Sequence, residues 1–112
     1  MDNIKEHEWG KEIVWSAKEN YCGKILVFEK AEKAMPLHFH KSKEKSWFVN
    51  AGAFLITWVD TADGKAYSKE LPEGSVFEIP ALTPVKLQAL QDNSAMAECS
   101  NSSEDDFYKI GL

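Results

Sequence analysis

Hydrophobic residues lie along the chain in short runs that glycine and proline separate. The runs are about five to nine residues long and rich in β-branched and aromatic side chains, which is typical of an antiparallel sandwich or barrel. Asp63-Gly64 predicts a tight hairpin turn. The best helical candidate covers 29–35 and ends at Pro36. The sequence therefore predicts an all-β fold, with strands over 24–29, 37–40, 46–50, 53–60, 65–71, 75–79, 85–90 and 95–99.

The segment 47–59 is apolar on both predicted faces. One face is expected to carry Trp47, Val49, Ala51, Ala53, Leu55 and Val59, and the other Phe48, Phe54, Ile56 and Trp58. A strand pair that is apolar on both faces needs cover on both sides. We therefore expect a two-layered fold that also packs against a second copy of the chain, as a homodimer.

Composition narrows the function classes. The 112 residues are enough for one domain, the net charge is −5, and all 13 basic residues are lysine. The absence of arginine argues against nucleic-acid binding, and the negative charge argues against anionic membranes. The N-terminus has no apolar leader, and the chain has only two cysteines, Cys22 and Cys99, so we expect a cytoplasmic protein with reduced thiols. The alternative is a single disulfide, if the two cysteines meet. We expect an N-terminal arm over 1–20 packed on a barrel over 21–100, then an acidic tail over 101–112.

His38-Phe39-His40 is the main chemical signal in the chain. Residues i and i+2 of a strand point to the same side, so the two imidazoles are expected on one face. Glu44 follows after a short loop and returns beside them if the chain reverses there. Two histidines and one carboxylate form a set suited to a divalent transition metal (Zn, Fe, Mn or Ni) with open positions. The alternative is a pair of surface histidines without a ligand.

Lysines and aromatic residues next to this motif are candidates for ligand binding. Lys41 and Lys43 are expected to place positive charge where an anionic substrate enters, and Phe48 is expected to contact that substrate. The alternative is that the lysines protect an exposed strand edge from pairing with another chain.

Two motifs resemble those of the cupins. His38-x-His40-x-x-x-Glu44 followed by Gly52 resembles the first cupin motif, and residues 71–84, from Leu71-Pro72-Glu73-Gly74 to Thr83-Pro84, resemble the second. The resemblance covers residues 21 to 99 and implies a single-domain double-stranded β-helix, also called a jelly-roll or cupin barrel, with the histidine pair facing the lumen.

One position departs from the second cupin motif. That motif usually carries a metal-binding histidine after the proline-rich turn, and Val85 stands there in this chain. The resemblance thus implies a metal held by three ligands, bound weakly or not at all. Glu98 or Cys99 would compensate by pointing inward, but we favour a solvent-facing Glu98 and a small core residue at Cys99.

Two groups of sugar-processing cupins show further similarity. Four segments resemble the cupin part of type II mannose-6-phosphate isomerases: Glu8-Trp9-Gly10, Lys24-Ile25-Leu26-Val27, Trp47 before Gly52, and 103–109. His38-Phe39-His40-Lys41 resembles a motif of nucleotide-sugar ketoisomerases, which work without metal.

Three functional hypotheses follow from these observations. The first is a metal-binding cupin that isomerises or epimerises a sugar phosphate or nucleotide sugar, with His38 and His40 as catalytic residues and His38, His40 and Glu44 as metal ligands. The second is an iron-dependent dioxygenase that uses the same three ligands. The third, supported by Val85, is a cupin that binds a small molecule without performing chemistry.

Overall fold

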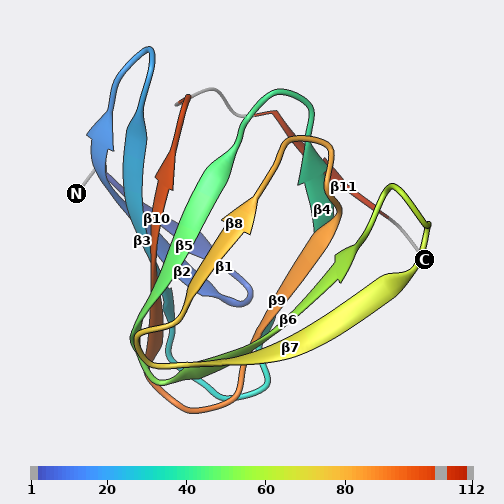
Figure 1. Ribbon diagram of the computed structural model, residues 1–112. Coiled ribbons are helices and arrows are strands. Elements are labelled where there is room, and N and C mark those ends of the chain that lie inside the picture. Colours follow the sequence, from blue (N-terminus) through green and yellow to red (C-terminus); the bar gives the residue numbers. More distant parts are fainter. Residues whose placement is uncertain (1–2, 103–105, 111–112) are drawn as a thin grey trace.

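The protein folds as two antiparallel sheets packed face to face. The computed structural model describes residues 3–102 and 106–110, and within these ranges the chain forms eleven strands and no helix (Figure 1). One sheet has six strands in the order β1-β2-β3-β10-β5-β8, and the other has five in the order β11-β4-β9-β6-β7. The strands are β1 (Ile4–His7), β2 (Gly10–Ala17), β3 (Cys22–Phe28), β4 (Ala34–His40), β5 (Lys45–Ala51), β6 (Ala53–Val59), β7 (Ala66–Pro72), β8 (Val76–Ile79), β9 (Val85–Ala89), β10 (Ser94–Ser100) and β11 (Phe107–Lys109).

The predicted strands are confirmed, with small shifts at their ends. The eight strands expected from the hydrophobic runs correspond to β3 through β10. The segment 29–35, which was the best helical candidate, does not form a helix, and β4 already begins at Ala34 and pairs with β9. Within the described residues, no helix has the length and apolar character that a membrane crossing would need.

The core fills the space between the two sheets. Large side chains from both sheets are almost fully buried there, among them Phe28, Trp47, Phe54, Ile56, Leu87 and Met96. The prediction that Trp47 and Phe54 lie on opposite faces is wrong. Gly52, with φ of +74°, turns the chain between β5 and β6 and thereby changes which positions face inward. Phe48 alternates with the buried Trp47 and Val49 along β5, so it points away from the core and is 45% exposed.

Both ends of the described chain add strands at sheet edges. Residues 1–20 include β1 and β2, and β2 pairs with β3. Near the other end, β11 pairs with β4 and brings Phe107 opposite His40. Residues 103–105 and 111–112 of the predicted acidic tail lie outside the described residues.

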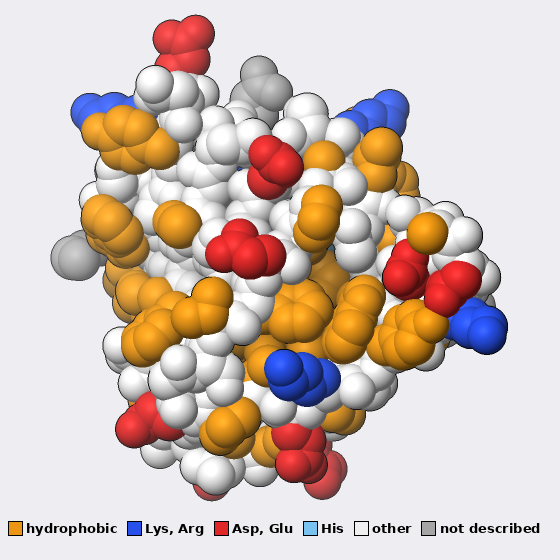
Figure 2. Space-filling view, in the orientation of Figure 1, with side chains coloured by type: hydrophobic (Ala, Val, Ile, Leu, Met, Phe, Trp, Pro, Cys, Tyr) orange, Lys and Arg blue, Asp and Glu red, His pale blue; other side chains and the backbone are white. Residues whose placement is uncertain are grey.

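An apolar row crosses the outer face of the six-stranded sheet. The row runs through directly paired positions on all six strands: Ile4, Ile13, Ile25, Ala97, Phe48 and Val76. Val76 is 60% exposed. Figure 2, which views the molecule with β5 and β8 in front, shows exposed hydrophobic side chains between separate acidic and basic ones. The outer face of this sheet therefore carries an exposed apolar row.

Candidate functional site

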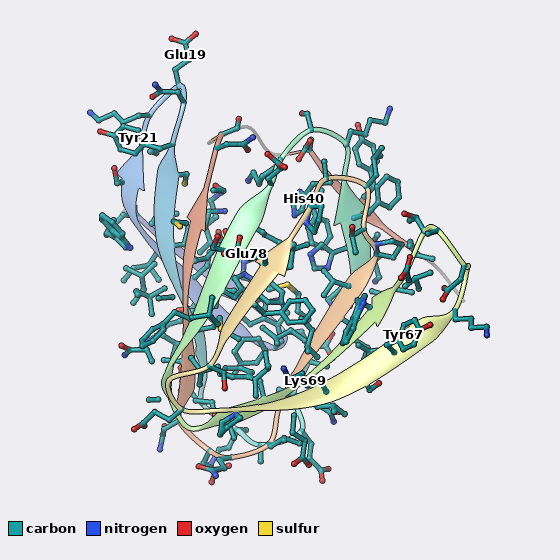
Figure 3. The ribbon with its side chains drawn as sticks, viewed as in Figure 1. Glu19, Tyr21, His40, Tyr67, Lys69 and Glu78 are labelled. Carbon is teal, nitrogen blue, oxygen red and sulfur yellow. The ribbon has the colours of Figure 1, made fainter. Side chains whose placement is uncertain are left out.

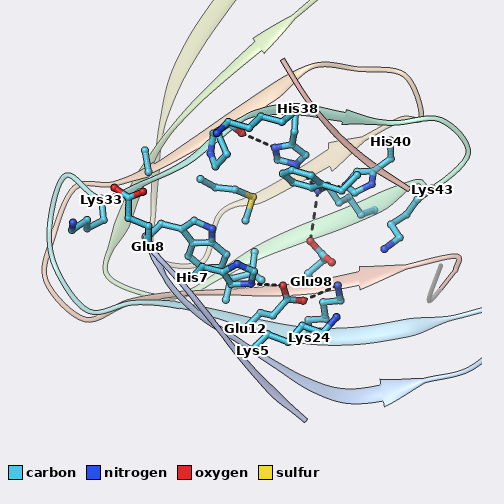
Figure 4. A pocket seen from close by; sticks show the side chains of 18 of the residues that line it. Lys5, His7, Glu8, Glu12, Lys24, Lys33, His38, His40, Lys43 and Glu98 are labelled. Carbon is cyan, nitrogen blue, oxygen red and sulfur yellow. Dashed lines mark hydrogen bonds and ion pairs between the residues drawn. The ribbon is translucent and has the colours of Figure 1, made fainter. Parts of the chain in front are cut away.

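A cavity of about 700 Å³ opens between the two sheets. Its walls come from β4 and β11 of the five-stranded sheet and from β1, β2, β3, β5 and β10 of the other. Figure 4 shows Glu8 and Lys33 at one end of this cavity and His40 and Lys43 at the other. The volume is in the range of small-molecule sites in proteins.

The centre of the site is Lys45, whose side chain reaches between the two histidines. Its Nζ lies 3.3 Å from Nε2 of His38 and 3.2 Å from Nε2 of His40. All three residues are buried, with exposed fractions of 5% for Lys45, 0% for His38 and 8% for His40. The histidines come from neighbouring inward positions of β4, and Lys45 is the first residue of β5. Figure 3 shows His40 within the molecule, whereas Tyr67 and Lys69 lie on β7 at its edge.

The hydrogen bonds determine which ring nitrogen carries the proton in each histidine. The Nδ1–H of His38 donates to the carbonyl oxygen of Pro36 at 2.7 Å, because a carbonyl can only accept. The Nδ1–H of His40 donates to Oδ1 of Asp106 at 2.9 Å. In the neutral rings both Nε2 atoms are therefore acceptors, and the Lys45 ammonium donates to them.

Burial keeps both imidazoles neutral. Burial, followed by the positive charge of Lys45, lowers the pKa of His38 from 6.5 to about 3. The same two effects lower the pKa of His40, although the Asp106 carboxylate acts in the opposite direction. Two neutral rings beside one cation explain why three nitrogen-bearing side chains are stable together.

A buried carboxylate balances the lysine. Oε1 of Glu98 lies 3.8 Å from Nζ of Lys45 and accepts the indole N–H of Trp47 at 2.8 Å. Burial raises the pKa of Glu98, but Lys45 and the Trp47 N–H outweigh burial, so the pKa is lowered and the carboxylate stays ionised. Burial lowers the pKa of Lys45 to about 8, and Glu98 limits that decrease. At neutral pH the site therefore contains an ammonium and a carboxylate.

Strand β11 and the residue before it cover one side of the histidine pair. The Phe107 ring stacks on His38, with centroids 4.3 Å apart. Asp106 also accepts hydrogen bonds from the backbone N–H and the hydroxyl of Ser42, at 2.9 and 3.1 Å. Burial acts to raise the pKa of Asp106, but the Ser42 and His40 hydrogen bonds lower it to about 2. Asp106 thus joins the β4–β5 loop to the segment that leads into β11.

A second ion cluster lines the opposite wall of the cavity. Oε2 of Glu12 on β2 forms an ion pair with Nζ of Lys24 at 2.8 Å, and Oε1 accepts a hydrogen bond from Nε2 of His7 at 2.7 Å. The His7 ring stacks on Trp9, with centroids 4.6 Å apart, and Trp9 stacks on Phe28. Figure 4 shows this cluster facing the cavity across from His38. The cavity therefore has both charged and flat aromatic surfaces.

The structure brings together only some of the residues predicted from sequence. His38, His40 and Lys43 line the cavity. Glu44 does not, because its side chain is exposed and it borders a separate, open depression between β5 and β10. The prediction of a His38, His40 and Glu44 triad is therefore not met. Two further predicted contacts are also outside the cavity: Lys41 is exposed and lies over the Tyr108 ring at 5.0 Å, and Phe48 faces outward.

The alternation of inward and outward residues along β5 explains why Lys45, and not Glu44, lies in the cavity. Trp47 and Val49 are buried positions of β5, and counting back by two from Trp47 reaches Lys45. Glu44 precedes the strand, and its backbone N–H donates to the side-chain oxygen of Asn101. The alternation that predicts a buried Trp47 would therefore also have identified Lys45.

On β10 the inward and outward assignments are reversed relative to the sequence expectation. Glu98 is buried at 6% exposure, and Cys99 is exposed. Glu98 pairs with Trp47, which places both on the inner face. Both cysteines are free thiols. Val85 is buried and pairs with His38, so an apolar side chain borders the histidines on that side.

The residues present do not form a set of metal ligands. Across residues 3–102 and 106–110, no group of three or more His, Cys, Asp and Glu side chains is placed to hold a metal ion. The Nε2 lone pairs of His38 and His40, which would bind a metal, are directed at the Lys45 ammonium. A protonated amine has no lone pair and repels a cation, so the arrangement does not fit a divalent ion.

The fold is shared with larger proteins of known structure. CapF, a capsular polysaccharide assembling protein from Staphylococcus aureus, superposes with a TM-score of 0.82 at 15% identity, over 97% of this chain and 32% of that one. Oxalate decarboxylase from Bacillus subtilis superposes with a TM-score of 0.83 at 16% identity, over 96% of this chain and 30% of that one. Another structure of that decarboxylase, at 17% identity, with a TM-score of 0.83 and the same coverage, concerns its Mn(II) centres.

The chain spans about a third of the length of these proteins, and at such low identity the likeness concerns the fold. No curated protein matches the sequence. A family model described as Cupin matches residues 19–109, which is most of the chain. Together with the two-sheet barrel and the histidine pair in its lumen, this match establishes that the chain belongs to the cupin family.

Proposed function

We propose that the protein binds a small anionic metabolite in the cavity between its sheets, with a sugar phosphate as the preferred class. The observation that carries this proposal is the charge of the lining. Six lysines (Lys5, Lys24, Lys33, Lys43, Lys45 and Lys109) and four glutamates (Glu8, Glu12, Glu32 and Glu98) line the cavity, although the whole chain has a net charge of −5. A positive cavity in a negative protein favours an anionic ligand.

Lys45 is suited to contact that ligand. An ammonium has three N–H groups, and two of them donate to His38 and His40. Among the described residues Nζ has no third hydrogen-bond partner, since Glu98 lies 3.8 Å away. One N–H is therefore left for a phosphate or carboxylate oxygen. Trp9, which is in the cavity wall, offers a flat surface for a sugar ring.

The proposal is tested by calorimetric titration with hexose 6-phosphates, the parent hexoses and inorganic phosphate. A hexose phosphate is expected to bind at least about tenfold more tightly than its parent hexose, a difference of about 1.4 kcal/mol. Lys45→Met is expected to weaken this binding at least tenfold, whereas Lys69→Met, an exposed lysine of β7 outside the cavity, serves as the matched control. Equal affinity for phosphorylated and unphosphorylated sugars, or no binding of either, contradicts the proposal.

Isomerisation of the bound sugar phosphate is the second candidate function. It is favoured by two neutral imidazoles next to a lysine with a pKa of about 8, all inside a ligand-sized cavity. His38 or His40 would first release its Nε2 lone pair from the Lys45 ammonium. It would then take a proton from the carbon next to the carbonyl and return it to the neighbouring carbon, while the released N–H of Lys45 donates to the charged oxygen. Exchange of deuterium from heavy water into hexose phosphates measures this step. Absence of exchange with a sugar phosphate that binds leaves the binding function and removes the isomerase.

The dioxygenase hypothesis has less support from the site. It requires two histidines and a carboxylate around open coordination positions. Glu44 lies outside the cavity, and the Lys45 ammonium takes up both imidazole lone pairs. The site therefore supports anion binding better than an iron-dependent reaction.

We also propose that two copies pair through the outer face of the six-stranded sheet. The apolar row from Ile4 to Val76 crosses all six strands, and Phe48 and Val76 are exposed by 45% and 60%. Phe48→Lys is expected to shift the mass in solution toward the monomer, whereas Tyr67→Lys, an exposed aromatic on the other sheet, is not. Light scattering coupled to gel filtration measures both variants. A wild-type monomer at all concentrations contradicts the pairing.

A further inference from the structure

The donors around Lys45 are of the types that bind metal ions, although within the described residues no three of them are placed to hold one. The Nε2 atoms of His38 and His40 and the Oε1 atom of Glu98 surround Nζ at 3.3, 3.2 and 3.8 Å. Two imidazole nitrogens and one carboxylate are a donor set that divalent transition metals accept. These three donors come from strands β4 and β10 (Figure 4). Lys45, the first residue of β5, places its Nζ atom among them.

We infer that the Lys45 ammonium occupies the position that a divalent metal ion would take between these donors. The ammonium thereby excludes such an ion from the two imidazoles. This inference goes beyond the proposed anion binding and does not depend on it. The hydrogen bonds on the other side of each ring support it. Pro36 and Asp106 fix the two Nδ1–H groups, which turns both Nε2 lone pairs toward Nζ. Metal-binding histidines are oriented by the same kind of partner.

The distances show why the lysine and a metal cannot be bound together. Zinc and similar ions bind imidazole nitrogen at about 2.0–2.1 Å. The imidazole nitrogens lie more than 3 Å from Nζ, which fits a hydrogen bond and leaves no space for an ion between them. A dication next to the ammonium would also be repelled. Loss of the lysine side chain, in contrast, leaves two lone pairs without donors and a buried carboxylate without its cation.

The test is titration of full-length variants with Co²⁺, monitored by calorimetry and by the visible absorption of bound cobalt. Lys45→Ala is expected to bind Co²⁺ at least about 100-fold more tightly than the wild type, since it removes a unit charge from the first few ångströms around the ion. Lys43→Ala is the matched control, because Lys43 is a buried lysine of the same cavity and, among the described residues, only Lys45 places its ammonium within hydrogen-bond distance of the two histidines. It is expected to bind Co²⁺ as weakly as the wild type.

A second variant covers the case in which Lys45→Ala does not fold, since that variant leaves the buried Glu98 uncompensated. Lys45→Ala/Glu98→Gln restores the charge balance and keeps both imidazoles, so it is expected to bind Co²⁺ more tightly than the wild type. Adding His40→Ala to either variant is expected to abolish the gain. The inference is overturned if the wild type binds Co²⁺ as tightly as Lys45→Ala, or if folded Lys45 variants gain no affinity. Neither result bears on the binding of sugar phosphates to the wild type.

Discussion

His38 is expected to make the fold sensitive to mild acid. Its side chain is fully buried, and burial, followed by the Lys45 charge, lowers its pKa from 6.5 to about 3. The unfolded chain takes up a proton at His38 near the ordinary pKa, whereas the folded chain does so only near pH 3. Stability is therefore retained above pH 6.5 and falls progressively as the pH decreases through this window. The loss is about 1.4 kcal/mol per pH unit, which amounts to about 2 kcal/mol between about pH 7 and 5.

The assay is urea unfolding of the wild type and His38→Gln at several pH values in that range. The variant is less stable at pH 7, so the informative quantity is the change in unfolding free energy with pH. Carboxylates with lowered pKa values titrate below this range, and His40 titrates in both proteins. We expect the wild type to lose about 2 kcal/mol more than His38→Gln. His7→Gln, at an exposed histidine, is the control. Equal pH dependence in the wild type and His38→Gln would show that protonation of His38 does not limit the stability of the fold.

Three further predictions concern single contacts. Trp47→Phe removes the N–H that Glu98 accepts at 2.8 Å, and urea unfolding is expected to show a loss of about 1–3 kcal/mol; an unchanged stability contradicts the role of this bond. Gly52→Ala and Gly64→Ala both place a Cβ at φ above +70°, but only the Cβ at position 52 would overlap a neighbouring side chain. The melting temperature is therefore expected to fall more for Gly52→Ala than for Gly64→Ala, and equal decreases would contradict this. Binding of a hexose phosphate is expected to weaken as the pH rises through about 8, because burial lowers the pKa of Lys45 to that value and deprotonation removes its charge. Calorimetry measures this dependence, and a constant affinity up to about pH 9.5 would contradict the role of the ammonium.

The fold was predictable from the sequence because its signals are local. Alternating apolar residues and Gly or Pro turns predict β3 through β10 to within a few residues. Strands β1, β2 and β11 were not predicted, because none of their residues is buried. They extend the two sheets through the pairing of β1 with β2, β2 with β3 and β11 with β4. Their pairing is a property of the assembled sheet and leaves little trace in the hydrophobic pattern.

The site was predictable only in part. Its chemistry depends on which residues of each strand face inward, and on contacts between residues that are far apart in the sequence. The histidine pair could be identified from its spacing, but the difference between Glu44 and Lys45 is a single residue at the start of β5. A shift by one position exchanges the inner and outer faces, which also reversed the expectation for Glu98 and Cys99. Asp106, which is 66 residues away from His40, reaches it only because β11 pairs with β4.

The position of the Lys45 ammonium between the two histidines, in place of a metal ion, is tested most directly by a high-resolution crystal structure. The protein would be purified without chelator, and anomalous data would be collected at the absorption edges of zinc, iron, manganese and nickel. We expect the Lys45 Nζ atom within hydrogen-bond distance of Nε2 of both His38 and His40, and no anomalous peak between the rings. An anomalous peak at about 2.1 Å from the two Nε2 atoms, with Lys45 turned away, would contradict it.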